Sequence, residues 1–154
     1  MNVRELLRKK SKGVVTVEST ATLARAAELM MDHAIGGLPV IELPGSALVG
    51  FVSERDIVDA VDRRSQEVLT ESVQDLPVTT VMRRPAPTCR GAESIRDVMA
   101  RMTRGRLRHL VVLDDEDRIA GVISVGDLVK DRLEELETEA GVLRDYVAGQ
   151  RAKK

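Results

Sequence analysis

Apolar side chains follow the same order twice along the chain, in residues 20–60 and again in residues 92–131. In each copy they recur first at intervals of three and four, which predicts an amphipathic helix, and then form short continuous runs, which predict buried strands. The matching pairs are Leu23 and Ile95, Met30 and Met102, Ile35 and Leu107, Leu38 and Leu110, Val40 and Val112, and Ile41 and Leu113. The duplication predicts two similar halves that pair about a pseudo-two-fold axis and enclose two related clefts.

Each copy is expected to form a β-α-β-β-α unit. The first comprises a strand at Val14–Val17, a helix from Leu23, strands at Leu38–Ile41 and Leu48–Val52, and a helix after Ser53. The second comprises a strand near Thr88, a helix at Ser94–Thr103, strands at Leu110–Leu113 and Ile119–Ile123, and a helix from Val125. One such unit buries too little surface to be comfortably stable alone. We therefore expect an α/β (α+β) fold in which two pseudo-symmetric motifs pack sheet to sheet.

Four segments divide the chain in this interpretation. They are a first motif at residues 1–66, a linker with a short helix at 67–87, a second motif at 88–131, and a C-terminal helix with a basic tail at 132–154. A short helix at Val3–Lys10 precedes the first strand, and the linker contains a predicted helical turn at Val78–Met82 followed by Pro85 and Pro87.

The last helix extends beyond its counterpart in the first copy and carries an apolar seam. Its members, Val129, Leu133, Leu136, Ala140, Leu143 and Val147, are separated by alternating steps of four and three. This is a heptad pattern. Two interpretations stay open: the seam joins two chains, or the helix kinks at Gly141 and folds back on its own domain.

The composition limits the classes of function. The formal net charge is −1, and Phe51 and Tyr146 are the only Phe, Tyr or Trp residues, so the chain lacks the charge and the stacking side chains of a nucleic-acid binder. Cys89 is the single cysteine, which excludes an internal disulfide and thiolate metal clusters. No apolar run approaches the roughly 20 residues that span a bilayer, and the N-terminus lacks the apolar stretch of a signal peptide. We expect a cytoplasmic protein with no nucleic-acid or membrane partner.

Catalysis has little support in the sequence. The two histidines, His33 and His109, lie outside any motif that combines a nucleophile with a base. They also lack the i, i+4 spacing of paired metal ligands. The expectation is a protein that is not an enzyme, with no catalytic residues, no metal site and no catalytic cofactor.

The pattern Ser-x-x-Asp occurs at both predicted strand-to-helix junctions, as Ser53–Asp56 and Ser124–Asp127. One interpretation is a capping box, in which the two side chains satisfy N–H groups at the helix end. The other adds a ligand, because a helix N-terminus attracts an anion and an aspartate accepts hydrogen bonds from ribose hydroxyls. The sequence leaves both open.

Cations gather before one of the two matched strands. Arg104, Arg106, Arg108 and His109 precede the strand that begins at Leu110. The equivalents of Arg108 and His109 in the first copy are Gly36 and Gly37. Because arginine binds phosphate bidentately, we expect the cleft of Asp127 to bind phosphate better than the cleft of Asp56. The Asp56 cleft is expected to contain His33 and Arg55, and this arginine would either contact a ligand or fill the space.

These features resemble a tandem CBS-domain pair, also called a Bateman module, of the small stand-alone bacterial type. The resemblance covers about residues 1–135. It rests on the duplicated order of elements and on the segments Gly-Phe-Val-Ser-Glu-Arg-Asp, ending at Asp56, and Gly-Val-Ile-Ser-Val-Gly-Asp, ending at Asp127. It implies paired clefts that bind adenosyl ligands such as AMP, ADP, ATP, NAD(H) or S-adenosylmethionine. AMP is the ligand we expect first, and NAD is the alternative.

The resemblance also implies which residues contact the ligand. Asp56 and Asp127 would hold the ribose, and Arg108 and His109 would contact phosphate. The other contacts it implies are Ser53 and Ser124 in the Ser/Thr position of the motif, Thr16 and Thr88 beside the purine, and Val40 and Val112 against the base. The pattern of cations, not the resemblance, adds Arg106 and Arg55 to the candidate binding residues.

The function implied by the resemblance is regulation. Ligand binding would change the angle between the halves, provided that the ligand has different affinities for the two arrangements. The signal would pass to an effector protein or through a homodimer. The alternative is a ligand-free scaffold in which the C-terminal seam makes the interaction.

Overall fold

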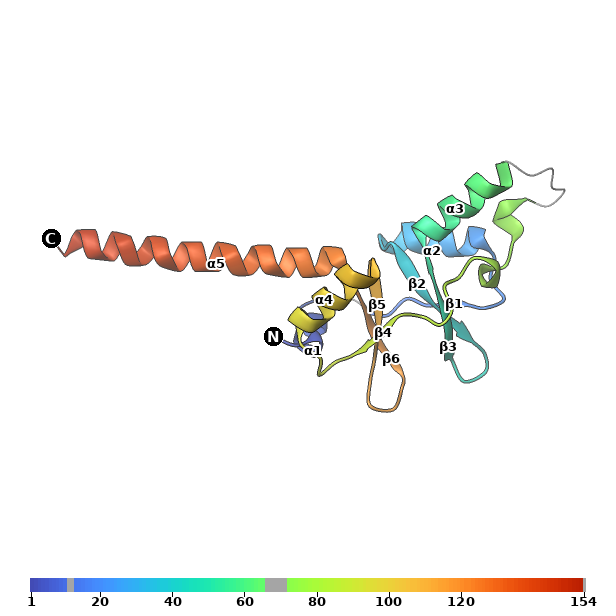
Figure 1. The fold of residues 1–154 in the computed structure, drawn as a ribbon, viewed down its shortest axis with the longest axis horizontal. Helices are drawn as coiled ribbons and strands as arrows, with labels where there is room; N and C mark the ends of the chain where they lie inside the picture. The colour runs from blue at the N-terminus through green and yellow to red at the C-terminus, as the bar shows by residue number, and fades with distance from the viewer. Residues whose placement is uncertain (11–12, 66–71, 154) are drawn as a thin grey trace.

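The computed structural model describes residues 1–10, 13–65 and 72–153. Its elements in chain order are α1 (Val3–Lys10), β1 (Val17–Glu18), α2 (Leu23–His33), β2 (Gly37–Glu42), β3 (Ala47–Ser53), α3 (Glu54–Ser65), η1 (Val73–Asp75), η2 (Val78–Thr80), β4 (Thr88–Arg90), α4 (Ile95–Gly105), β5 (His109–Leu113), β6 (Ile119–Ser124) and α5 (Val125–Ala152). Two β-α-β-β-α units follow one another, and α5 extends far beyond the second (Figure 1). The expected fold class is confirmed.

Each unit has its own three-stranded sheet. The strand orders are β1-β2-β3 and β4-β5-β6, and in both the first strand is parallel and the third antiparallel to the central one. The register shifts between Val40 and Ile41 in one sheet and between Val112 and Leu113 in the other. These residues are matched in the sequence repeat, so the duplication extends to the irregularities of the backbone.

Equivalent residues also begin and end α2 and α4. Thr22 Oγ1 accepts a hydrogen bond from Arg25 N at 3.2 Å, and Ser94 Oγ accepts one from Asp97 N at 3.1 Å, as expected of N-caps. Ala34 and Arg106 end the two helices in the left-handed conformation, each with a φ of 52°. This turn directs the chain from each helix into the central strand of its sheet.

The central strands are buried on both faces. Neighbouring residues of a strand point to opposite faces of the sheet. Val40 in β2 and Val112 in β5 belong to the cores of the first and second half, respectively. Pro39 and Val111, next to them, are also fully buried although they belong to neither core. The second face of each sheet is therefore covered by the other half, which is the sheet-to-sheet pairing that the sequence predicted.

Two segments cross from one half to the core of the other. Val3 and Leu6 of α1 lie in the core of the second half, and Val78 of η2 lies in the core of the first. The predicted boundaries group α1 with the first motif and η2 with the linker. Each core is thus completed by a segment that lies outside its own repeat.

Two equivalent glycines allow these crossing segments to approach the sheets. A Cβ on Gly50 of β3 would lie 2.9 Å from the carbonyl oxygen of Arg83 and 2.5 Å from Met82 Sδ. A Cβ on Gly121 of β6 would lie 2.7 Å from Leu7 Cδ2, in α1. At both places the crossing segment packs directly against strand backbone.

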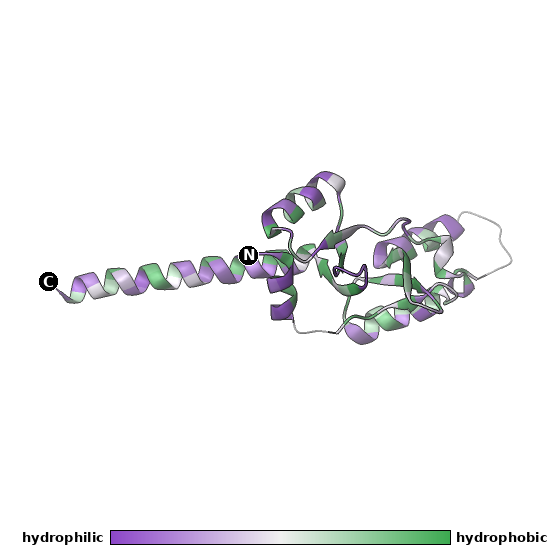
Figure 2. Ribbon diagram, turned by 90° about the horizontal axis from the view of Figure 1, so that it is seen from below, coloured by the Kyte–Doolittle hydropathy of each residue, from purple (hydrophilic) through white to green (hydrophobic). Residues whose placement is uncertain are grey.

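Helix α5 is continuous from Val125 to Ala152 and passes Gly141 without folding back. It extends away from the two sheets (Figure 1), and hydrophobic residues alternate along it with hydrophilic ones (Figure 2). The fold-back interpretation of the apolar seam is therefore wrong. Within the described residues, no helix combines the length and the apolar character needed to cross a membrane.

Replacing Gly50 with alanine should destabilise the fold by about 1–3 kcal/mol, the usual effect of overpacking, because the new Cβ would overlap Met82 and the backbone of Arg83. The free energy of unfolding in denaturant measures this change. Gly141→Ala is the matched control: nothing lies within 4 Å of its Cβ position, and helix propensity favours alanine by about 1 kcal/mol. Equal losses of stability in the two variants would contradict the close packing of Met82 and Arg83 against Gly50.

Candidate functional site

Two clefts lie between the halves, and each contains one Ser-x-x-Asp junction. The Asp56 cleft has a volume of about 320 Å³, and its lining includes Ser53, Arg55, Asp56, Arg83, Arg106 and Arg108. The Asp127 cleft has a volume of about 680 Å³, and its lining includes Lys10, Val14, Val15, Ile35, Ser124 and Asp127. Gly36 and His109 line both.

At both junctions the serine and the aspartate form a reciprocal capping box. Asp56 Oδ2 accepts hydrogen bonds from Ser53 N at 2.8 Å and Ser53 Oγ at 2.9 Å, while Ser53 Oγ accepts one from Asp56 N at 3.3 Å. Asp127 Oδ2 accepts from Ser124 N at 2.9 Å, and Ser124 Oγ accepts from Asp127 N at 3.1 Å. The capping interpretation is confirmed. A role in ligand binding stays a prediction, and it would use the carboxylate's remaining acceptor capacity.

Asp127 differs from Asp56 because a lysine is bonded to it. Lys10 Nζ, at the end of α1, donates to Asp127 Oδ2 at 2.8 Å and to the carbonyl oxygen of Val122 at 2.8 Å. Burial raises the pKa of Asp127, but hydrogen bonds from Lys10 and Ser124 outweigh that effect and hold the pKa below its ordinary value. The sequence alone does not identify Lys10 as a partner of Asp127. The two residues are 117 positions apart in the chain, and the sequence shows Lys10 only as the last of three basic residues at the end of a helix.

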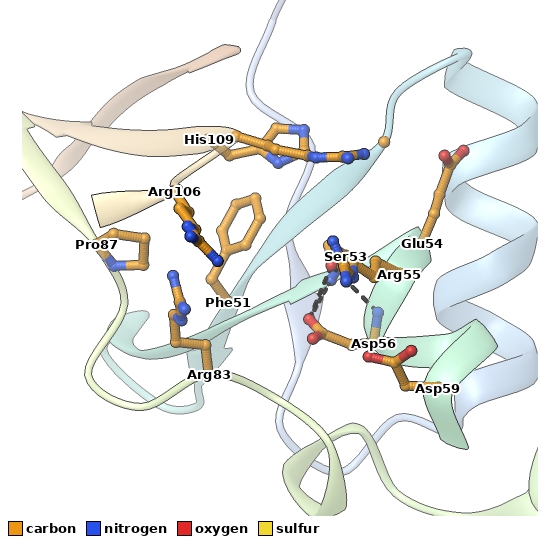
Figure 3. A pocket seen from close by; sticks show the side chains of 12 residues that line it. Phe51, Ser53, Glu54, Arg55, Asp56, Asp59, Arg83, Pro87, Arg106 and His109 are labelled. Atoms are coloured by element: carbon orange, nitrogen blue, oxygen red, sulfur yellow. Dashed lines mark hydrogen bonds between the residues drawn. The ribbon is translucent and has the colours of Figure 1, made fainter. Parts of the chain in front are cut away.

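The arginines gather in the Asp56 cleft. Arg55 comes from α3, Arg83 from the segment before β4, and Arg106 and Arg108 from the turn before β5. Figure 3 shows Arg83 and Arg106 reaching from opposite sides toward the space beside Phe51. The expected placement of Arg108 with Asp127 is wrong, so the more cationic cleft is the one that contains Asp56.

Arg108 lines the Asp56 cleft because of how the two halves pair. The carbonyl oxygen of Arg108 accepts a hydrogen bond from Val125 N at 3.0 Å, and His109 pairs with Ser124 across β5 and β6. The backbone before β5 therefore does lie beside the Ser124 junction. The Arg108 side chain, however, lines the cleft of the other half's junction. The first half shows the same arrangement. Gly37 pairs with Ser53 across β2 and β3, but it lines the cleft of the other junction, that of Asp127.

His109 forms part of the wall between the clefts. Its ring lies 5.2 Å from that of Phe51, centroid to centroid, with the planes tilted by 35°. A Cβ on Gly36 would lie 3.4 Å from His109 Nε2. Burial lowers the pKa of His109, and the positive charge of Lys10 lowers it further. A neutral ring is therefore favoured at pH 7, and it offers a phosphate one N–H donor rather than a positive charge.

Several expected contacts lie elsewhere. Val40 and Val112 are 0% and 1% exposed and belong to the two cores. Thr16 and Thr88 are half-buried and stand outside the lining of both clefts. His33, expected beside Asp56, lines the Asp127 cleft.

Apolar residues other than Val40 and Val112 line the two clefts. Because β1 begins only at Val17, later than the strand expected at Val14–Val17, Val14 and Val15 are left to line the Asp127 cleft together with Ile35. Phe51 is the aromatic residue of the Asp56 cleft. The Asp127 cleft is thus the larger and more aliphatic of the two.

Cys89 is buried away from both clefts. Burial in the second core raises the pKa of the Cys89 thiol to about 11, so it is neutral at pH 7. Over residues 1–10, 13–65 and 72–153, no cluster of three His, Cys, Asp or Glu side chains is arranged to hold a metal ion.

Comparisons with known proteins agree with this architecture. The family described as "CBS domain" matches the chain twice, over residues 3–63 and 75–134. A solved CBS-domain containing protein from Agrobacterium tumefaciens is 32% identical, with a TM-score of 0.76 over 85% of this chain and 92% of that one. A CBS domain protein from Pyrobaculum aerophilum, solved in complex with AMP, is 26% identical, with a TM-score of 0.75 over 91% of this chain and 99% of that one.

Among curated relatives, an uncharacterized protein from Methanocaldococcus jannaschii is 32% identical over 119 residues, which are 77% of this chain and 36% of that protein. The inosine-5'-monophosphate dehydrogenase of the same organism is 29% identical over 121 residues, which are 79% of this chain and 22% of the enzyme. The similarity to these two longer proteins therefore covers only a part of each.

Replacing Lys10 with methionine should raise the pKa of Asp127, because it removes a hydrogen bond and a positive charge that favour the carboxylate. A carboxyl whose pKa is lowered by folding adds stability above its unfolded-state pKa of about 3.9, and this stability is lost as the pH falls through the folded-state value. The stability advantage of the wild type should therefore be present at pH 7 and shrink below about pH 4. Carbon-13 titration of the Asp127 carboxyl measures the pKa.

Lys9→Met is the matched control for this experiment. It removes the same charge one residue away, but Lys9 bonds Asp131 at 3.0 Å rather than Asp127. The pKa of Asp127 should stay close to the wild-type value in this variant. An Asp127 pKa that is equally unaffected by Lys10→Met would show that the ion pair contributes nothing in solution.

Proposed function

The chain belongs to the CBS domain family, and we propose that it is a regulatory module that binds an adenosyl nucleotide in the clefts between its halves. The composition of the Asp56 cleft carries this proposal. Four guanidinium groups suited to phosphate and three carboxylates, Glu54, Asp56 and Asp59, line the same space of about 320 Å³, and Asp56 at the strand-to-helix junction is the carboxylate suited to ribose hydroxyls. A nucleoside monophosphate presents both groups on one molecule.

In this arrangement Asp56 accepts hydrogen bonds from the ribose, and Arg106 and Arg108 bind the phosphate. Arginine is suited to this role because its planar fork matches two phosphate oxygens. Arg55 lies in the first turn of α3, where the N-terminal end of the helix adds its own attraction for an anion. We therefore propose that Arg55 contacts the ligand rather than filling the cleft.

AMP is the ligand we propose first. The Pyrobaculum aerophilum relative supports this class, because its structure contains AMP and its fold matches most of this chain. NAD is the alternative. Its second nucleoside would have to extend past His109, which stands between the two clefts.

The Asp127 cleft is proposed as the weaker nucleotide site. Its aliphatic lining suits a base, but its aspartate is already held by Lys10 at 2.8 Å. A ribose that binds Asp127 must compete with that ion pair. A ligand that breaks the bond between Lys10 and Asp127 would loosen α1 from the start of α5. Binding in this cleft would in this way change how the two helices are held together.

The proposed output is a change in how the halves or the chains are arranged. A ligand shifts such an equilibrium only through different affinities for the two states. The output would be read by an effector protein or within a homodimer, and the chain itself would catalyse no reaction. A ligand-free scaffold is the competing function, and the exposed seam of α5 is the observation that favours it.

Replacing Arg108 with alanine should weaken AMP binding about tenfold or more, the usual effect of losing a hydrogen bond between charged groups. Adenosine has no phosphate, so its affinity should change much less. Raised salt should narrow the difference in AMP affinity between wild type and variant, because salt screens exposed charges. Calorimetry on nucleotide-free protein measures both affinities. Arg104→Ala is the control, because Arg104 is exposed and lines neither cleft. Equal losses for AMP and adenosine in Arg108→Ala would refute the phosphate contact.

Replacing Asp56 with asparagine tests which cleft is the stronger site. Asparagine keeps an acceptor for the capping bonds from Ser53 but removes the charge that favours ribose hydroxyls. The tighter AMP-binding event should be lost or weakened in Asp56→Asn and retained in Asp127→Asn. The reverse result would assign the stronger site to the Asp127 cleft, and an absence of binding in the wild type would favour the scaffold.

A further inference from the structure

Helix α5 carries an apolar seam that the rest of the described chain leaves uncovered. Leu128 is the last residue of α5 that is buried, and Asp131, one turn further on, still bonds Lys9 of α1 at 3.0 Å. From Arg132 to Lys153 every residue except Gly141 is exposed. The exposed fractions of the large seam residues are 49% for Val129, 55% for Leu133, 44% for Leu136, 63% for Leu143 and 43% for Val147. Regular apolar exposure of this kind is typical of an interface.

We propose that the seam binds the same seam of a second copy of this chain, in a parallel two-stranded coiled coil. The heptad places Leu133, Ala140 and Val147 at a positions and Val129, Leu136 and Leu143 at d positions. Leucine at d is suited to a two-stranded parallel pair. Since most helices in water are stabilised by packing rather than by propensity, the second copy would also stabilise α5 itself.

The charges beside the seam select the parallel orientation. In a parallel pair each g residue faces the following e residue of the other chain. Arg132 would therefore face Glu137, and Glu139 would face Arg144, with both pairs repeated by symmetry. Arg132 is bonded to Glu135 of its own helix at 2.6 Å, but that exposed pair is weak and open to exchange.

An antiparallel pair that overlaps the whole seam brings like charges together. In that orientation e faces e and g faces g. Glu137 would face Glu137, Glu139 would face Glu139, and Lys130 would face Arg144 of the other chain. Like charges at such positions oppose pairing and unlike charges favour it. The same apolar seam is thus compatible with two orientations, and its flanking charges favour one.

The surface at the base of α5 is consistent with two globular parts at the same end. Met99 of α4 and Val125 and Val129 of α5 are exposed and line one shallow pocket with Leu128. Arg55, Arg106 and Arg108 line the same pocket, and its apolar side chains are continuous with the seam through Val129. Gly126 occupies the preceding a position, where the absence of a side chain lets two helices approach closely.

The first experiment measures the dimer by sedimentation equilibrium of the full chain. The double variant Leu136→Glu, Leu143→Glu places charges on two d positions that are exposed in the single chain, so folding should be retained. Its dimer dissociation constant should rise at least about tenfold, or about 1.4 kcal/mol. Val142→Glu is the matched control, because Val142 is 65% exposed and lies off the seam. An unchanged dissociation constant in the double variant, or an equal rise in the control, would overturn the proposal.

The second experiment determines the orientation by cross-linking. Leu143→Cys should form a disulfide-linked dimer in a glutathione buffer, because a d residue faces its own equivalent only in a parallel pair. Val142→Cys should cross-link much more slowly, and the native Cys89 is buried and should not interfere. Preferential cross-linking in a mixture of Leu133→Cys and Leu143→Cys chains would show antiparallel helices and refute the charge argument. Helix pairing requires no nucleotide, so these results are independent of the ligand experiments.

Discussion

Strands β2 and β5 are buried on both faces, and a single half can cover only one of them. Val40 and Val112 pack under the helices of their own units, whereas Pro39 and Val111 are buried by what lies beyond each sheet. Removing this second apolar face from water requires the other half. Because the halves are related by a pseudo-two-fold axis, their pairing produces two clefts. The location of the candidate site is therefore a consequence of how the core is completed.

The chemistry of the clefts comes from groups that also stabilise the fold. Asp56 and Asp127 cap helices, and their bonds to serine N–H groups would be needed without any ligand. The two junctions become different because of what the opposite half contributes. Arginines line the cleft of Asp56, and Lys10 is bonded to Asp127. The asymmetry thus lies in the side chains around an almost symmetric backbone.

The order of elements and the two capping boxes could be predicted from the sequence because both depend on local patterns. Periodicity located the helices and strands, and Ser-x-x-Asp is a pattern within one helical turn. The partners across the interface could not be predicted in this way. The repeat shows that Arg108 is equivalent to Gly36, but equivalence does not tell which cleft a side chain enters. Lys10 is separated from Asp127 by most of the chain, and only the packing of α1 on the second half brings them together.

The exchange of segments between the halves has a consequence for how the protein is made. Chains usually begin to fold from the N-terminal side while the ribosome is still extending them. Helix α1 leaves the ribosome before every other described element, yet its core partners Val98, Leu110 and Ile123 are synthesised after all three strands of the first half. The first half, in turn, waits for Val78 to complete its core. Neither half can finish folding when its own repeat has been synthesised, and the last step of assembly returns the earliest helix to the most recently made sheet.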